Sequence, residues 1–159
     1  MQNKIFIEVQ EEIDSPTWLS NVESFLHKVL EKLDYKNLEI SLFFCNDEYI
    51  KELNSQYRKI DSATDVLSFE NDSSYEEDGI TWKVIGDIVI SVQMISENAK
   101  YFETTEDDEL KRLLVHGVLH LNGFDHGEEH IEKNVTPTCE MLVLQENILE
   151  QLKNEKIIY

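Results

Sequence analysis

The first part of the chain alternates between strand and helix patterns. Lys4 to Gln10 places apolar side chains at every second position, which predicts a short strand with one apolar face. Ser15-Pro16 offers a serine cap and a proline suited to a first helical turn, and apolar residues then recur at helical spacing as far as Leu33. The chain therefore begins with a strand followed by an amphipathic helix.

The same alternation continues through the middle of the chain. Leu38 to Phe44 is rich in strand-forming residues, and Asn46 can cap a helix that ends near Arg58-Lys59. Thr64 to Phe69 predicts a third strand. The polar, acidic residues 71–79 that follow predict an exposed, mobile loop.

The remaining pattern completes one α+β domain. Val84 to Ser91 is a run of branched residues that predicts a strand buried on both faces, and Ser91 can cap a helix through Phe102. Thr104 or Thr105 begins another helix, and a last amphipathic helix follows Pro137. We expect residues 1–159 to form a single compact domain, in which helices cover a small mixed sheet of about four strands.

The net charge, the lengths of the apolar runs and the cysteines limit which partners and which cellular compartment are expected. The net charge of −19 argues against broad, nonspecific adhesion to nucleic acid, although a local phosphate-binding site stays open. No apolar run approaches the roughly 20 residues of a membrane span, and the N-terminus does not have the pattern of a signal peptide. Cys45 and Cys139 lie in unrelated contexts, so a reduced cytoplasmic protein without membrane association is expected.

Three histidines define the candidate chemistry. His116 and His120 are four residues apart, so a helix projects both from one face. Gly123 permits a left-handed turn that ends this helix, after which His126 can return toward the same point. Three imidazoles of this kind suit a borderline-soft divalent metal, with zinc as the first candidate.

The spacing also resembles the skeleton of the long zinc-protease motif, but one residue differs. Gly117 stands where those proteases have the glutamate that acts as general base, which disfavours a peptidase. Three ligands leave an open position that favours catalysis, because a purely structural zinc site normally has four protein ligands. His130 is a candidate fourth ligand and Cys139 a weaker one, while Asp125 either orients an imidazole or holds the turn.

Three blocks of sequence resemble one known family. HGVLHLNGFDH (residues 116–126) is similar to the signature of the YbeY-type rRNA maturation factors, the zinc-dependent single-strand endoribonucleases of bacteria. ELNSQYRKIDSATDVLSF (residues 52–69) and VIGDIVIS (residues 84–91) resemble two further family blocks in the same order. Ala63 and Glu70 stand where the family usually has proline, and the acidity is high for a protein expected to meet ribosomal RNA.

The resemblance implies a function and a set of site residues. It implies one zinc ion on His116, His120 and His126, and Arg58 as a functional cation facing the metal across a groove. A guanidinium can hold a phosphate through two hydrogen bonds, and with the resemblance this role is favoured over the alternative, a cation placed at the end of its helix by the helix dipole. The expected activity is endonucleolytic cleavage of single-stranded RNA in 16S rRNA maturation and ribosome quality control.

A second function class stays open beside the enzyme. The chain could act as a ribosome-assembly factor that docks on a ribosomal protein or an assembly GTPase, with the metal mainly shaping the fold. The acidic surface suits a basic ribosomal protein better than naked RNA. Binding without cleavage at any metal loading would favour this alternative.

Overall fold

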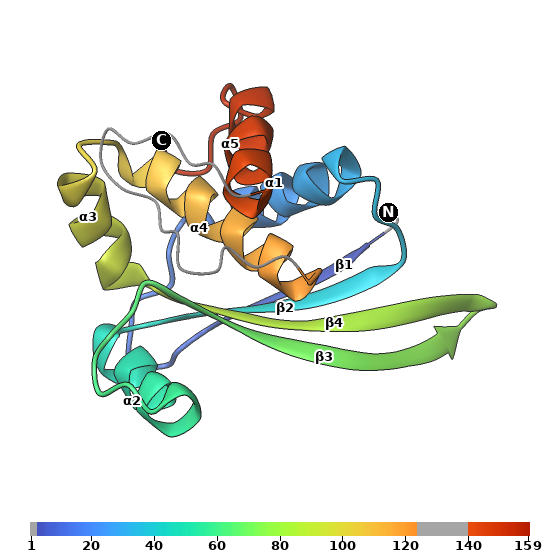
Figure 1. Ribbon diagram of the computed structural model, residues 1–159, viewed down its shortest axis with the longest axis horizontal. Helices are drawn as coiled ribbons and strands as arrows, with labels where there is room; N and C mark the ends of the chain where they lie inside the picture. Colours follow the sequence, from blue (N-terminus) through green and yellow to red (C-terminus); the bar gives the residue numbers. More distant parts are fainter. Residues whose placement is uncertain (1–2, 124–139) are drawn as a thin grey trace.

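The computed structural model describes residues 3–123 and 140–159, and its strands form one mixed sheet (Figure 1). The strand order is β1-β2-β4-β3. β1 and β2 pair in parallel, as do β2 and β4, whereas β3 runs antiparallel to β4. The sequence-based prediction of a four-stranded mixed sheet in an α+β domain is confirmed. The strands are β1 (Lys4–Val9), β2 (Leu38–Cys45), β3 (Val66–Glu77) and β4 (Ile80–Ser91).

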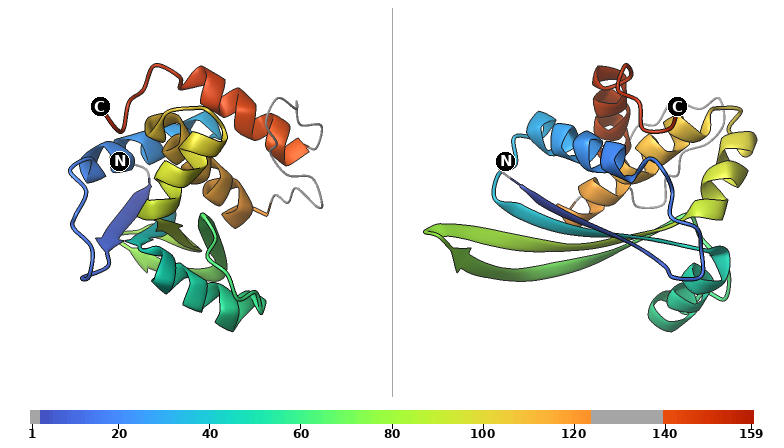
Figure 2. Two further views of the ribbon diagram at one scale, coloured as in Figure 1. Left: turned by 90° about the vertical axis from the view of Figure 1, so that its left-hand side faces the viewer. Right: turned by 180° about the vertical axis from the view of Figure 1, so that it is seen from behind.

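Helices cover both faces of the sheet unequally. α1, α4 and α5 lie over one face and α2 lies against the other, while α3 leads from the end of β4 toward α4 (Figures 1 and 2). None of the helices in the described part of the chain is long and apolar enough to cross a membrane. The helices are α1 (Leu19–Lys32), α2 (Asp47–Arg58), α3 (Val92–Tyr101), α4 (Glu106–Leu121) and α5 (Glu140–Gln151).

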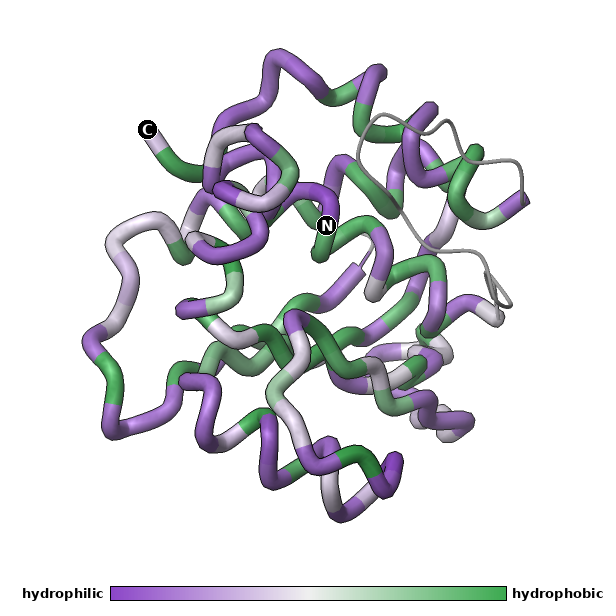
Figure 3. Tube along the Cα trace, turned by 60° about the vertical axis from the view of Figure 1, so that its left-hand side comes forward, coloured by the Kyte–Doolittle hydropathy of each residue, from purple (hydrophilic) through white to green (hydrophobic). Residues whose placement is uncertain are grey.

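The central strand β4 is buried from both sides, as its run of branched residues predicts. Ile88 and Ile90 belong to the main core between the sheet and the upper helices. Val89 points the other way and packs with Cys45 and Ile50 under the sheet, where α2 covers it. Hydrophobic residues accordingly concentrate along the central strands (Figure 3).

Three of the predicted helix caps are present. The side chains of Asn46, Ser91 and Thr105 each accept the backbone N–H three residues further along, at the start of α2, α3 and α4. The predicted start of the first helix is wrong, because α1 begins at Leu19 with Trp18 as its cap residue rather than at Ser15-Pro16. The Trp18 ring packs edge-to-face on Phe44, which draws the helix start toward the core.

The prediction of a mobile loop over residues 71–79 is wrong. β3 continues to Glu77 and a tight turn at Asp78-Gly79 leads directly into β4. Both turn residues have positive φ, 53° and 79°, which is the backbone of the two-residue turn that Asp-Gly favours in antiparallel hairpins. These residues are nevertheless mostly exposed, and the hairpin extends well beyond the rest of the sheet (Figure 1).

Cross-strand contacts hold the extended hairpin against β1 and β2. Tyr75 stands opposite Trp82, and the Lys4 ammonium lies 4.3 Å from the centre of the Trp82 ring. Lys4 also donates to the Tyr75 hydroxyl at 3.0 Å, and that hydroxyl donates to Glu39 at 2.6 Å. A cation–π contact and a polar network therefore stabilise a segment whose sequence is polar enough to suggest a loop.

Candidate functional site

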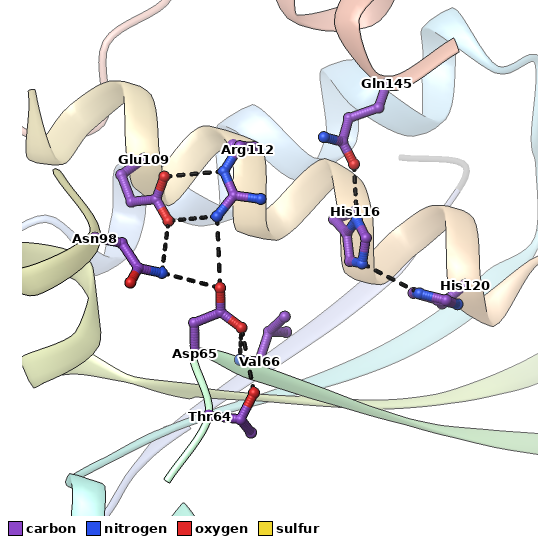
Figure 4. Close-up of polar contacts among 9 residues, drawn as sticks. All are labelled: Thr64, Asp65, Val66, Asn98, Glu109, Arg112, His116, His120 and Gln145. Carbon is purple, nitrogen blue, oxygen red and sulfur yellow. Dashed lines mark hydrogen bonds and ion pairs between the residues drawn. The ribbon is translucent and has the colours of Figure 1, made fainter. Parts of the chain in front are cut away.

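Helix α4 places two of the predicted metal ligands side by side. The Thr105 hydroxyl accepts the N–H of Asp108 at 3.1 Å, and four acidic residues in the first turn complement the positive end of the helix. Further along the same helix, His116 and His120 lie one turn apart. Their Nε2 atoms are 3.1 Å apart (Figure 4), so the two imidazoles converge on one point.

A glutamine on α5 orients the first imidazole. Gln145 is fully buried, and its Oε1 lies 2.8 Å from Nδ1 of His116 (Figure 4). Because an amide oxygen only accepts, Nδ1 carries the proton and donates it to Gln145. The Nε2 lone pair of His116 then points away from Gln145 and toward the His120 ring, which is the arrangement typical of metal-ligating histidines.

The histidine pair fits a zinc ion. In a tetrahedral site with Zn–N bonds of about 2.0–2.1 Å, two ligand nitrogens lie about 3.3 Å apart. The observed 3.1 Å between the Nε2 atoms is close to this value. Within residues 3–123 and 140–159, no three metal-binding side chains come together. The predicted third ligand His126 lies outside the described residues, as do the alternatives Asp125, His130 and Cys139.

Glycines shape the helix around this pair. Gly123 has φ 88°, so the left-handed turn predicted after the helix is confirmed. Gly117 is buried, and a Cβ built on it would meet two atoms of the Ile88 side chain at 3.0 Å. A side chain at this position would crowd Ile88, so the packing of α4 on the sheet favours glycine over the glutamate of the protease motif.

A groove of about 1100 Å³ runs past the histidines. Its lining comes from the end of α2, the start of β3, the end of α3, and the facing sides of α4 and α5. Arg58 is exposed in the last turn of α2 and lines this groove together with His116 and His120. The structure thus brings three of the four predicted site residues to one cavity, while the functional role of Arg58 stays a prediction.

A second arginine in the groove belongs to a buried polar network. The Arg112 guanidinium donates to both carboxylate oxygens of Glu109, at 2.9 and 2.6 Å, and reaches Asp65 at 3.4 Å (Figure 4). Asn98 donates to the same two acids. Burial acts to lower the pKa of Arg112, but hydrogen bonds and charge from Glu109 and Asp65 outweigh it and raise that pKa above its usual value.

This network joins the two sides of the groove. Asp65 lies directly before β3, seven residues after Arg58, whereas Glu109 and Arg112 lie on the helix that carries the histidines. Sequence reasoning missed this network and Gln145. The spacing of three between Glu109 and Arg112 was visible as a helical ion pair, but Asp65 and Gln145 approach α4 only through the tertiary fold.

Comparison with known proteins agrees with this architecture. The family model for endoribonuclease YbeY matches residues 4–153. The endoribonuclease YbeY of Treponema denticola is 47% identical over 158 residues, covering 99% of this chain and 98% of the relative. That of Borreliella afzelii is 37% identical over 141 residues, covering 87% and 88%.

A solved structure supports the same fold. The solution structure of TM1509 from Thermotoga maritima is 30% identical, with a TM-score of 0.62, and covers 96% of this chain and 90% of that one. With the family model matching most of its length and close relatives matching nearly all of it, this chain belongs to the endoribonuclease YbeY family.

Proposed function

We propose that this protein is a metal-dependent endoribonuclease that cleaves single-stranded RNA during 16S rRNA maturation in the cytoplasm. Zinc would be held by His116, His120 and His126. The observation that carries the proposal is that Arg58 and the converging histidine pair line one groove. Its curated relatives carry the name endoribonuclease, at up to 47% identity.

The residues of the groove have separable tasks. Arg58 would hold a nonbridging phosphate edge through two N–H groups and stabilise the charge that develops on it during cleavage. Gln145 holds Nδ1 of His116, and Nε2 would then be available to bind the metal. When bound, zinc supplies Lewis-acid polarisation and lowers the pKa of water at the site. Gly117 supports a nuclease over a peptidase, because it offers no general base.

Metal content and RNA cleavage measured on the same samples test this proposal. We expect about one zinc per chain in the parent, and loss of both metal and cleavage in His116→Ala. Arg58→Ala should keep the metal and lose cleavage by about 100-fold. His27→Ala, on α1, is the matched control and should behave as the parent. Undiminished cleavage by metal-free His116→Ala would refute the proposal.

A second function is docking on a ribosomal protein or an assembly GTPase, and the net charge of −19 favours a basic ribosomal protein as the partner. Such binding would bring the groove to its RNA even though the surface as a whole repels phosphate. Pull-down with ribosomal proteins, before and after metal removal, separates the two functions. Retained binding with no RNA cleavage at any zinc loading would make docking the main activity.

A further inference from the structure

Two tyrosine rings are unusually exposed in the groove that holds the histidines. Tyr57, beside Arg58 at the end of α2, is 65% exposed, and Tyr101, at the end of α3, is 64% exposed. Both belong to the lining of the same cavity. They therefore approach one groove from different helices, and neither contributes much of its surface to the core.

Each exposed ring is held in place by a second aromatic side chain. The Tyr57 ring meets Phe69 at a centroid distance of 5.3 Å and an interplanar angle of 71°. The Tyr101 ring meets Phe102 at 4.9 Å and 87°, and the Arg112 guanidinium lies 5.1 Å from the Phe102 ring. Edge-to-face packing fixes both tyrosines without covering them, so their orientation is set before any ligand arrives.

The charged side chains that line this groove contribute little to RNA binding. Arg112 is already paired with Glu109 and Asp65. In the described part of the chain this leaves Arg58 as the one lining arginine that can meet a phosphate. With a net charge of −19, the protein needs an uncharged source of binding energy.

We propose that Tyr57 and Tyr101 are stacking platforms for unpaired nucleobases of the RNA held in this groove. Aromatic rings stack on any base, because every base has a π-face, and this interaction needs no positive charge on the protein. In a duplex these faces are covered by neighbouring base pairs, so two such platforms select single strands. The inference rests on the proposed function for its RNA substrate, and it assigns the single-strand selectivity to two named residues.

Equilibrium binding of a short RNA tests the platforms separately from cleavage. The probe is a fluorescein-labelled 2′-O-methyl RNA hexamer, compared with the same backbone lacking all six bases. Its integrity after each titration is checked by gel electrophoresis. Tyr57→Ala and Tyr101→Ala should each bind the hexamer about tenfold more weakly, whereas Tyr57→Phe and Tyr101→Phe should stay near the parent.

Controls separate stacking from general effects. Tyr159→Ala removes a 94% exposed tyrosine outside the groove and should bind as the parent. The abasic backbone should bind weakly and equally to all variants. The logarithm of the binding constant should fall only slightly with the logarithm of the salt concentration, by about 0.7 for each phosphate contacted.

Specific results would overturn the inference. Alanine variants that bind the hexamer as the parent does, or an abasic strand that binds as well as the normal one, would show that the rings do not stack on bases. If the parent nevertheless cleaves RNA, the proposed function stands and the stacking inference falls. If stacking is found but no metal loading gives cleavage, the inference stands and the nuclease proposal falls.

Discussion

Gln145 determines which nitrogen of His116 faces the groove. Replacing it with leucine removes the acceptor for Nδ1–H while leaving a side chain of similar size in the core. We expect Gln145→Leu to weaken zinc binding by about 10- to 100-fold with the fold intact. Competition against a chromophoric chelator measures this, with His27→Ala as the control. Unchanged zinc affinity would mean that the hydrogen bond does not orient a ligand.

Gly117 lets α4 pack closely on β4. A methyl group at this position would stand 3.0 Å from Ile88, so Gly117→Ala combines overpacking of about 1–3 kcal/mol with a gain in helix propensity of up to about 1 kcal/mol. We expect a net loss of about 1 kcal/mol in the free energy of unfolding, measured with urea. Ile88→Val removes Cδ1, one of the two atoms at 3.0 Å, so the double variant should lose less than the sum of the two single changes. Additive losses would show that these side chains do not compete for space.

At the scale of single elements, local signals predict the helices well. Asn46, Ser91 and Thr105 cap their helices because a cap depends on residues within one turn. The histidine pair follows for the same reason, because a spacing of four places both rings on one face. The partners of those helices could not be predicted in this way. Gln145 and Asp65 reach α4 from 29 and 47 residues away, and no local pattern specifies their contacts.

In the β3–β4 hairpin, the acidic composition hid the sequence signal of a turn between two strands. Its acidic residues favour a loop, whereas Asp78-Gly79 and the pairing of Tyr75 with Trp82 favour a turn between strands. The turn conformation prevails because it lets the flanking residues extend the sheet. Composition is therefore a weaker guide here than the two residues at the turn.

The turn itself can be tested by substitution. Gly79 has φ 79°, and a Cβ added to it would have no neighbouring atom within 4 Å, so a side chain there costs backbone strain alone. We expect Gly79→Val to lower the free energy of unfolding by about 1–2 kcal/mol. Gly79→Asn should lose less, because asparagine tolerates positive φ. Equal losses in urea unfolding for both variants would point to a cause other than φ.

At the scale of the whole molecule, a few polar contacts hold α4 against the elements on either side of it. The Asp65–Arg112 contact ties the strand that follows Arg58 to the histidine helix. A second polar contact lies in the first turn of α4, where the Asp107 carboxylate accepts the backbone N–H groups of Ile157 and Ile158 at 2.7 and 2.9 Å. The position of α4, and with it the histidine pair, thus depends on the C-terminal segment.

Lys111 takes part in this second polar contact. Its ammonium lies 3.3 Å from the Asp107 carboxylate and donates to the carbonyl of Glu155 at 2.9 Å, and the Lys111 and Asp107 side chains are only 3% and 5% exposed. Lys111→Met leaves the buried Asp107 carboxylate with only the half-exposed Lys156 ammonium, 3.9 Å away, as its cation. Removing one partner of a buried pair in this way costs about 3–5 kcal/mol.

Urea unfolding of three variants separates the buried charge from the loss of packing. Lys111→Met should lose about 3 kcal/mol, whereas Lys153→Met, which breaks an exposed pair with Glu150, should lose at most about 1 kcal/mol. Adding Asp107→Asn to Lys111→Met removes the buried negative charge while keeping an acceptor, so the double variant should recover part of the loss. Hydrogen exchange at the Ile157 amide should quicken in Lys111→Met and slow again in the double variant. A double variant less stable than Lys111→Met would show that the Asp107 carboxylate stabilises the C-terminal segment without needing Lys111.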